Sequence, residues 1–313
     1  MFKFRAAEES DVDQLIAFLP GAGLRSIERD RLRRDFADGR MRAEWSWLVE
    51  IDGVLAGRAL WWGRPDSSRP LALDALDVAE HVEEPAVVAA GLLSTAHAAL
   101  AERGVTVPLE YTLQLPRGWR LDAAACAAVG WRRDACRSNG LSVELERLQY
   151  AWTRGEGNVP ATSGRVTFRP GEDEEFLDLF SQVARGSLDV ETQRALIEMG
   201  EQAQARDDLE FYLGCPGERE WWRVAVFGDG RVAGFAIPSA TPYHRNVGYL
   251  GVLPAWRGQG LVDDLLGAVT RIHAQAGAET ITATTDTGNA PMAAAFERAG
   301  YEITEVRLIL SAS

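Results

Sequence analysis

The sequence predicts an α/β (α+β) protein built from two similar halves, each with a mixed central sheet flanked by helices. Strand-like and helix-like hydrophobic patterns alternate along the chain. The 313 residues exceed the size of about 250 residues at which a single core stops growing, so two domains are expected. The composition, 46% hydrophobic and 25% charged, is typical of a globular protein.

Short motifs recur in the same order in both halves, which indicates an old duplication. The offsets between the copies are 164, 177 and 170 residues. The copies are Phe-Arg at 4–5 and 168–169, Asp-Gly-X-X-Ala-Gly at 52–57 and 229–234, and Ala-Ala-Ala followed by Gly-aromatic at 123–131 and 293–301. We therefore expect domains at 1–151 and 165–313, joined by a linker at 152–164 that is rich in Gly, Thr, Ser and Pro.

The elements follow from local patterns. Each Asp-Gly pair lies between two apolar runs, which is typical of a β-hairpin. After the second hairpin the period changes to that of a helix, which Gly277 ends. The predicted elements are hairpins at 47–51 with 55–61 and at 224–227 with 232–237, strands at 247–252, 281–285 and 306–310, and helices at 261–276 and 291–299.

The net charge of −13 lies mostly in the second half, because residues 1–155 carry 20 basic and 23 acidic groups and residues 156–313 carry 13 and 23. A chain this acidic argues against nucleic-acid binding. The field would attract cationic small molecules, although solubility alone also explains it.

The spacing of the cysteines and the N-terminal sequence limit which further classes of function are expected. Cys126, Cys136 and Cys215 show no metal-binding or disulfide spacing, so no metal is expected. No secretion signal and no long apolar run is evident. We expect a cytoplasmic protein with no membrane partner, and the oligomeric state stays open.

One segment carries a chemical signal. Arg257-Gly258-Gln259-Gly260 lies between the strand at 247–252 and the helix that begins near Leu261. Glycines let backbone N–H groups converge, and a helix start adds unpaired donors and partial positive charge, which suits a phosphate or pyrophosphate. A simple glycine-rich turn is the alternative. The spacing matches neither a Walker loop nor a Rossmann fingerprint.

The wider pattern over 165–313 resembles the GNAT superfamily of N-acetyltransferases. The matching residues are Val252, Pro254, Arg257, Gly258, Gly260, Asn289, Gly300 and Tyr301. The resemblance implies a tandem GNAT fold with a degenerate first copy. It implies that the main-chain amides of Arg257, Gly258, Gln259, Gly260, Leu261 and Val262 bind the pyrophosphate of acetyl-CoA. The backbone of Leu250, Gly251 and Val252 would bind the pantetheine arm, and Asn289 would contact it; Asn289 also fits a helix N-cap.

The sequence departs from this family at two positions. Val262 stands where the family has Gly or Ala. Phe296 stands where the family has the Tyr that protonates the leaving thiolate, so that role passes to Tyr249, Tyr301 or water. Asp286 and His244 are the candidate bases, and an ordinary solvated Asp or loop His is the alternative for each.

The first half lacks the glycine loop. An offset of 173 places Glu84-Pro85-Ala86-Val87 opposite residues 257–260. Pro85 removes an amide donor, Val87 adds a β-branched side chain and Glu84 repels phosphate. We expect the first half not to bind coenzyme A and to shape or cover the acceptor pocket, or simply to pack.

The sequence therefore predicts transfer of an acetyl group from acetyl-CoA, as co-substrate, to a primary amine of a small molecule, with the site in the second half. The acidic field would favour a cationic acceptor. The alternative is a catalytically inactive coenzyme A-binding regulatory or sensor module.

Overall fold

The structure is a computed structural model that describes residues 2–155 and 159–312. The chain divides into unit 1, Met1–Glu146 with Val306–Ser313, and unit 2, Arg147–Glu305. This division differs from the predicted domains 1–151 and 165–313. Residues 147–153 pair with a strand of unit 2, and residues 306–310 pair with a strand of unit 1. Both boundaries differ from the predicted ones because of long-range strand pairing, which local sequence patterns do not reveal.

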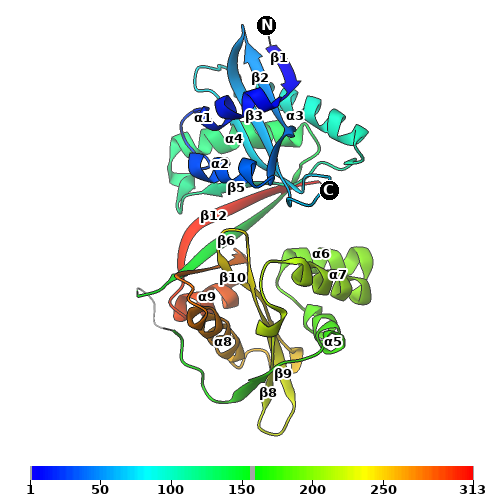
Figure 1. The fold of residues 1–313 in the computed structure, drawn as a ribbon. Coiled ribbons are helices and arrows are strands. Elements are labelled where there is room, and N and C mark those ends of the chain that lie inside the picture. The colour runs from blue at the N-terminus through cyan, green and yellow to red at the C-terminus, as the bar shows by residue number, and fades with distance from the viewer. Residues whose placement is uncertain (1, 156–158, 313) are drawn as a thin grey trace. The chain divides into compact units, whose positions relative to one another are not determined.

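Unit 1 is a mixed sheet with helices packed against it (Figure 1). Its strands follow the order β1-β2-β3-β4-β5, and residues 306–310 of β12 lie beside β5. Its elements are β1 (Phe2–Ala6), α1 (Val12–Ala17), α2 (Arg29–Ala37), β2 (Met41–Ile51), β3 (Val54–Trp62), β4 (Ala72–Val78), α3 (Pro85–Glu102), β5 (Tyr111–Leu115) and α4 (Ala123–Arg137).

Among the described residues, α3 is the one helix that is long and apolar enough to cross a membrane, judged by length and composition alone. It packs against β1, β2, β3 and β4 of unit 1. Its buried residues are Val88, Ala89, Leu92, Leu93, Ala96 and Leu100. This apolar helix therefore contributes to the core of unit 1.

Unit 2 repeats the mixed arrangement, with strand order β6-β11-β10-β9-β8-β7. Strand β12 begins in this unit beside β6, where the Thr304 hydroxyl donates to the Gln149 carbonyl at 3.3 Å. The elements are β6 (Val143–Thr153), β7 (Val166–Arg169), α5 (Asp173–Ala184), α6 (Val190–Met199), α7 (Glu201–Gly214), β8 (Arg223–Phe227), β9 (Val232–Ala240), β10 (Arg245–Val252), α8 (Leu261–Gln275), β11 (Thr280–Asp286), α9 (Ala290–Arg298) and β12 (Glu302–Ser311). Both hairpins and the later predicted strands and helices are confirmed.

The predicted linker at 152–164 has definite structure at both ends. Trp152 and Thr153 belong to β6, whereas residues 156–158 lie outside the described residues. The segment before β7 runs along α8, because the Ser163 N–H and hydroxyl donate to Asp264 at 2.5 and 2.8 Å, and Arg271 donates to the Pro160 carbonyl at 3.0 Å. This segment, residues 159–165, is called the α8 strap below.

The parting of β10 from β11 creates the space for a site. The two parallel strands pair only at Arg245 with Ile281 and at Asn246 with Thr282. Beyond these pairs β10 stays bonded to β9 on its other side, with a bulge between Val247 and Tyr249. Bulges of this kind re-aim the backbone next to functional sites. The edge of β10 that faces β11 is therefore left without a strand partner after Asn246.

Asp264 should be the residue that fixes the α8 strap. It is 2% exposed and accepts three hydrogen bonds, from the Ser163 N–H, the Ser163 hydroxyl and, at 3.1 Å, Arg165. We expect Asp264→Ala to lower the free energy of unfolding by about 3 kcal/mol, because buried donors lose their charged acceptor. Urea denaturation measures this.

The matched control is Asp263→Ala. Asp263 is the preceding residue of α8 and pairs with Arg298 in solvent, so its loss should cost about 1 kcal/mol or less. Equal losses in the two variants would show that the strap is not held through Asp264.

Candidate active site

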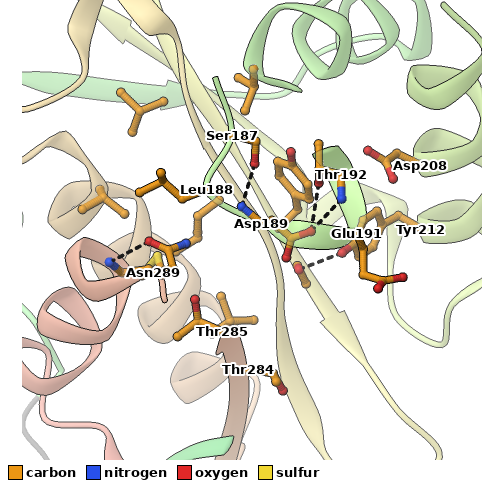
Figure 2. A pocket seen from close by; sticks show the side chains of 18 of the residues that line it. Ser187, Leu188, Asp189, Glu191, Thr192, Asp208, Tyr212, Thr284, Thr285 and Asn289 are labelled. Carbon is orange, nitrogen blue, oxygen red and sulfur yellow. Dashed lines mark hydrogen bonds between the residues drawn. The ribbon is translucent and has the colours of Figure 1, made fainter. Parts of the chain in front are cut away.

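A cavity of about 920 Å³ opens in unit 2 where β10 and β11 part. This volume lies within the range of small-molecule sites. Its walls come from β10, β11, the segment before α6, α7, and the starts of α8 and α9. Figure 2 shows Asn289 on one side of it and Asp208 with Tyr212 on the other, with the segment from Ser187 to Thr192 between them.

The glycine loop, residues 257–262, forms one end of the cavity. Gly258 and Gly260 have φ angles of +74° and +73°, a conformation that side chains disfavour. A Cβ at Gly258 would meet no atom within 4 Å. No backbone carbonyl of the described chain accepts a hydrogen bond from the N–H groups of residues 258–262. The loop therefore offers unpaired donors at the start of the 15-residue helix α8.

The lining includes Gly258, Gly260, Leu261 and Val262, but not Gln259. The Gln259 carbonyl instead accepts from Arg165 at 2.6 Å. Arg165 also lies close to Gly260, with Nη2 3.8 Å from the position of a Cβ there. This cation beside the loop was missed by sequence reasoning, because it comes from the α8 strap and no spacing links it to the loop.

Arg257 holds the loop to helix α5. Its Nε donates to the Val252 carbonyl at 3.1 Å, and its Nη atoms donate to the carbonyls of Val183, Arg185 and Gly186 at 2.5, 2.7 and 3.0 Å. Burial lowers the pKa of Arg257 from its usual value. The Arg257 side chain lines the cavity, but its N–H groups are taken up by these carbonyls. Arg257 therefore positions the loop at the end of α5.

Strand β10 forms the floor of the cavity. Leu250 and Val252 line it, whereas Gly251 packs on Phe235, whose Cε1 would lie 2.5 Å from a Cβ at that position. The Tyr212 hydroxyl donates to the Gly248 carbonyl at 2.9 Å and so fixes the bulge. The edge of β10 is thus held open toward the cavity.

Asn289 and Phe296 belong to α9. The Asn289 side chain accepts from the Met292 N–H at 3.3 Å, so Asn289 is the N-cap of that helix while it also lines the cavity. Phe296 is 2% exposed and packs against Tyr150 and Tyr301 at ring distances of 4.9 and 5.5 Å. Tyr301 shares a hydrogen bond with Thr270 at 2.7 Å in the core and does not line the cavity, so it is not placed as a proton donor.

Asp286 and His244, the candidate bases, do not line the cavity. Asp286 is 2% exposed, and its two oxygens accept from Arg147 Nε and the Val190 N–H, both at 2.7 Å. It ties the end of β11 to the start of α6. His244 lies exposed in the turn between β9 and β10, where its backbone bonds to Thr241. The structure therefore assigns neither side chain a place beside a substrate.

Tyr249 does line the cavity, together with Asp208, Phe211 and Tyr212 of α7, which sequence reasoning missed. These four residues are called the Asp208 end below. Tyr212 and Tyr249 lie edge to face with ring centroids 5.9 Å apart. The spacing of 208, 211 and 212 on one helix face was the available signal, but the partner surface was not visible in the sequence.

Asp208 is a half-buried carboxylate without a basic partner. Gln204 Nε2 donates to its Oδ2, and no Lys, Arg or His of the described chain forms an ion pair with it. Burial raises its pKa to about 7, and the carboxylates of Asp207 and Asp189 act in the same direction. Asp208 therefore exchanges its proton near neutral pH, as a general base requires.

The corresponding place in unit 1 is filled by the chain itself. Strands β4 and β5 also pair in parallel at one point, Leu73 with Tyr111. Arg132 of α4 is buried there; its Nε donates to the Leu76 carbonyl of β4 at 3.0 Å, and its guanidinium hydrogen-bonds the Tyr111 side chain of β5. Helix α3 begins at Pro85 without a glycine loop. The parting of these strands is thus closed by an arginine.

Comparisons with known proteins agree with this architecture. Residues 189–301 match the model of the acetyltransferase (GNAT) family. The structure is similar to a GCN5-related N-acetyltransferase from Sphaerobacter thermophilus, with TM-score 0.57 and 18% identity over 98% of this chain and 94% of that one. It is also similar to a tandem GNAT protein from the clavulanic acid biosynthesis pathway, with TM-score 0.52 and 16% identity over 100% and 99%. Comparison with curated protein sequences finds no match.

Asp286 should affect stability rather than chemistry. We expect Asp286→Ala to lower the free energy of unfolding by about 3 kcal/mol, because Arg147 and the Val190 N–H lose a buried charged acceptor. Urea denaturation measures this. His244→Ala, in the exposed turn, should change stability by less than about 0.5 kcal/mol. A stable Asp286→Ala protein would contradict the anchoring role.

Proposed function

We propose that this protein transfers an acetyl group from acetyl-CoA to a primary amine of a small molecule, in the cavity of unit 2, because residues 189–301 match the model of the GNAT acetyltransferase family and line much of that cavity. The family and fold support N-acyltransferase activity in general. The observation that carries the finer proposal is the row of unpaired N–H groups at residues 258–262, which opens into the same cavity as the free edge of β10.

The glycine loop fits the pyrophosphate of acetyl-CoA. Its N–H groups and the start of α8 supply donors and partial positive charge. Arg165 lies beside Gly260, where its charge is shared with its ion-pair partner Asp264. This local arrangement can hold an anion in spite of the net charge of −13. Val262 leaves its amide available, since a side chain at that position removes no donor.

The edge of β10 fits the pantetheine arm. An amide-containing arm can add to an unpaired strand edge through main-chain hydrogen bonds. Leu250 and Val252 flank that edge, and Asn289 lies across the cavity from the Asp208 end (Figure 2). Acetyl-CoA would supply the activated acetyl group as a thioester, while the protein orients it and accepts a proton from the amine.

Tyr249 is the proposed proton donor to the leaving thiolate. Burial raises its pKa above the usual value, and the carboxylates of Asp208 and Asp189 raise it further. The phenol therefore stays protonated at neutral pH, in the cavity that Phe296 lines without a hydroxyl. A thiolate with a pKa of about 8.5 needs only modest assistance to leave.

Unit 1 supports a single site. Arg132 occupies the parting of β4 and β5, and Pro85 stands at the start of α3. We therefore propose that acetyl-CoA binds to unit 2 alone.

Gly260→Val tests the glycine loop. We expect the dissociation constant for acetyl-CoA to rise tenfold or more, equal to about 1.4 kcal/mol, because the side chain enters the space that the anion needs. Calorimetric titration measures this. The matched control is Gly277→Val at the end of α8, which has a φ of +85° and no neighbour within 4 Å. It carries similar backbone strain, of about 1–2 kcal/mol, and should leave the affinity unchanged.

Release of free thiol from acetyl-CoA in the presence of a primary-amine panel tests the transfer itself. Thiol release that depends on the amine supports the enzyme. Tight acetyl-CoA binding with no thiol release from any amine would instead favour a regulatory coenzyme A-binding module, for which Phe296 is the motivating residue.

Tyr249→Phe tests the proton donor. We expect kcat to fall about a hundredfold with the acetyl-CoA dissociation constant unchanged, because the ring stays and only the proton is lost. The matched control is Tyr301→Phe, whose hydroxyl bonds to Thr270 in the core, and kcat should not change there. Steady-state kinetics with one active amine measures both. A wild-type kcat in Tyr249→Phe would assign the proton to water.

A further inference from the structure

We infer that the Asp208 end is the acceptor site, and that it takes a primary amine as its ammonium ion, with an apolar chain or ring beside the charge. Asp208 would contact the ammonium group and remove its proton. This inference rests on the proposed function, since it names the acceptor class and the base of that reaction. It concerns residues 208, 211, 212 and 249, which all line the cavity.

The placement of the aromatic side chains supports a cation with an apolar substituent. Phe211 and Tyr212 lie edge to face at 5.1 Å, and Tyr212 and Tyr249 at 5.9 Å. Aromatic faces attract an ammonium ion and also pack against apolar groups. Phe211 is 56% exposed and Leu188 is 52% exposed, although both line the cavity. An apolar substituent would cover surface that is costly to leave in water.

Asp208 itself has no counter-ion among the described residues. Asp207 on the same helix and Asp189 before α6 are both acidic, and Tyr212 and Tyr249 are neutral. Arg147 pairs with Asp189 and Asp286, and Arg257 faces carbonyls and Tyr249 rather than Asp208. A half-buried carboxylate in this position is stabilised by a cation that enters the cavity. The ammonium ion of the acceptor supplies that charge.

The contacts of Asp208 leave it able to accept a proton. Gln204 orients Oδ2, and Oδ1 has no hydrogen-bond donor in the described chain. Tyr212 stays fixed to the Gly248 carbonyl and does not compete for the carboxylate. Asp208 thus combines an oriented carboxylate with one oxygen that is available to accept from a ligand.

The reaction balances with the groups named. The ammonium ion gives one proton to Asp208, and the nitrogen lone pair then forms the C–N bond to the thioester carbonyl carbon. The C–S bond then breaks. Tyr249 donates its hydroxyl proton to the leaving thiolate and receives the second proton from the nitrogen. The products are the amide, free coenzyme A thiol and one proton, which Asp208 releases to water.

The pH dependence has a definite sign. Only ionised Asp208 binds and deprotonates the ammonium ion, and burial raises its pKa to about 7 in the free protein. The value of kcat/KM should therefore fall as the pH decreases through about 7. Ammonium binding favours the carboxylate form, so binding at pH 7 should release a proton from a partly protonated Asp208.

Calorimetric titration of the full chain with 2-phenylethylamine tests the binding step directly, in two buffers of different ionisation enthalpy. We expect the wild-type protein to bind the amine with proton release and to bind the uncharged 2-phenylethanol at least thirtyfold more weakly. Methylamine should bind at least tenfold more weakly than 2-phenylethylamine, and Phe211→Ala should reduce that difference. Equal binding of amine and alcohol would overturn the inference.

Asp208→Asn should weaken amine binding at least thirtyfold and abolish the proton release, with the acetyl-CoA dissociation constant unchanged. Its kcat/KM should lose the decrease below pH 7. The matched control is Glu210→Gln, an exposed residue on the same helix that does not line the cavity, and it should behave as wild type. Asp208→Glu should recover part of the binding and the proton release, which a general folding defect would not allow.

The outcomes separate this inference from the proposed function. If acetyl-CoA binds and thiol is released while Asp208→Asn keeps wild-type amine binding and pH profile, the acceptor site is wrong and the transferase stands. If the amine binds through Asp208 but acetyl-CoA does not bind, the proposed function is wrong and the amine site stands. An unchanged carboxyl titration of Asp208 on amine addition, followed by NMR, would also overturn the inference.

Discussion

The parting of β10 from β11 after Asn246 and Thr282 is the constraint on which the site depends. Two parallel strands that continued to pair would leave neither an open edge nor a cavity. The bulge between Val247 and Tyr249 and the Tyr212 hydrogen bond to Gly248 hold β10 in its course. Arg257 fastens the end of β10 to α5, so that the glycine loop opens at the head of the cavity.

The charge distribution separates two tasks within one acidic unit. At the glycine loop, unpaired N–H groups and the start of α8 provide positive potential over a few ångströms, and Arg165 lies beside them in an ion pair with Asp264. At the Asp208 end, the Asp208 carboxylate lies among aromatic rings and forms no ion pair with a basic side chain of the described chain. In the proposed reaction, the anionic donor and the cationic acceptor would therefore use different groups of one cavity.

Unit 1 has a similar framework in which the corresponding opening is filled. Strands β4 and β5 part after one pair, as β10 and β11 do after two. In unit 1 the guanidinium of Arg132 donates to the Leu76 carbonyl. Its ion pair with Asp77 offsets the cost of burying the charge. Pro85 at the start of α3 removes a donor where α8 has its glycine loop. In the first copy, the opening between the two strands is therefore occupied by the chain's own side chain.

The sequence by itself determined the two-copy α/β fold, the hairpins, the helix after Gly260 and the glycine loop, because each depends on local periodicity, turn chemistry or a repeat. It also predicted the absence of that loop from the first half through Pro85. The tertiary structure alone decided that Asp286 anchors α6, that Arg257 caps α5, that Arg165 lies against the glycine loop, and that Asp208 lines the cavity. These roles depend on contacts between residues far apart in the chain, such as Arg165 with Gln259 and Tyr249 with Tyr212. The pairing of residues 306–310 with β5 and of residues 147–153 with β11 also depends on tertiary structure. Strand partners are set by packing of the sheet faces and not by proximity in the sequence.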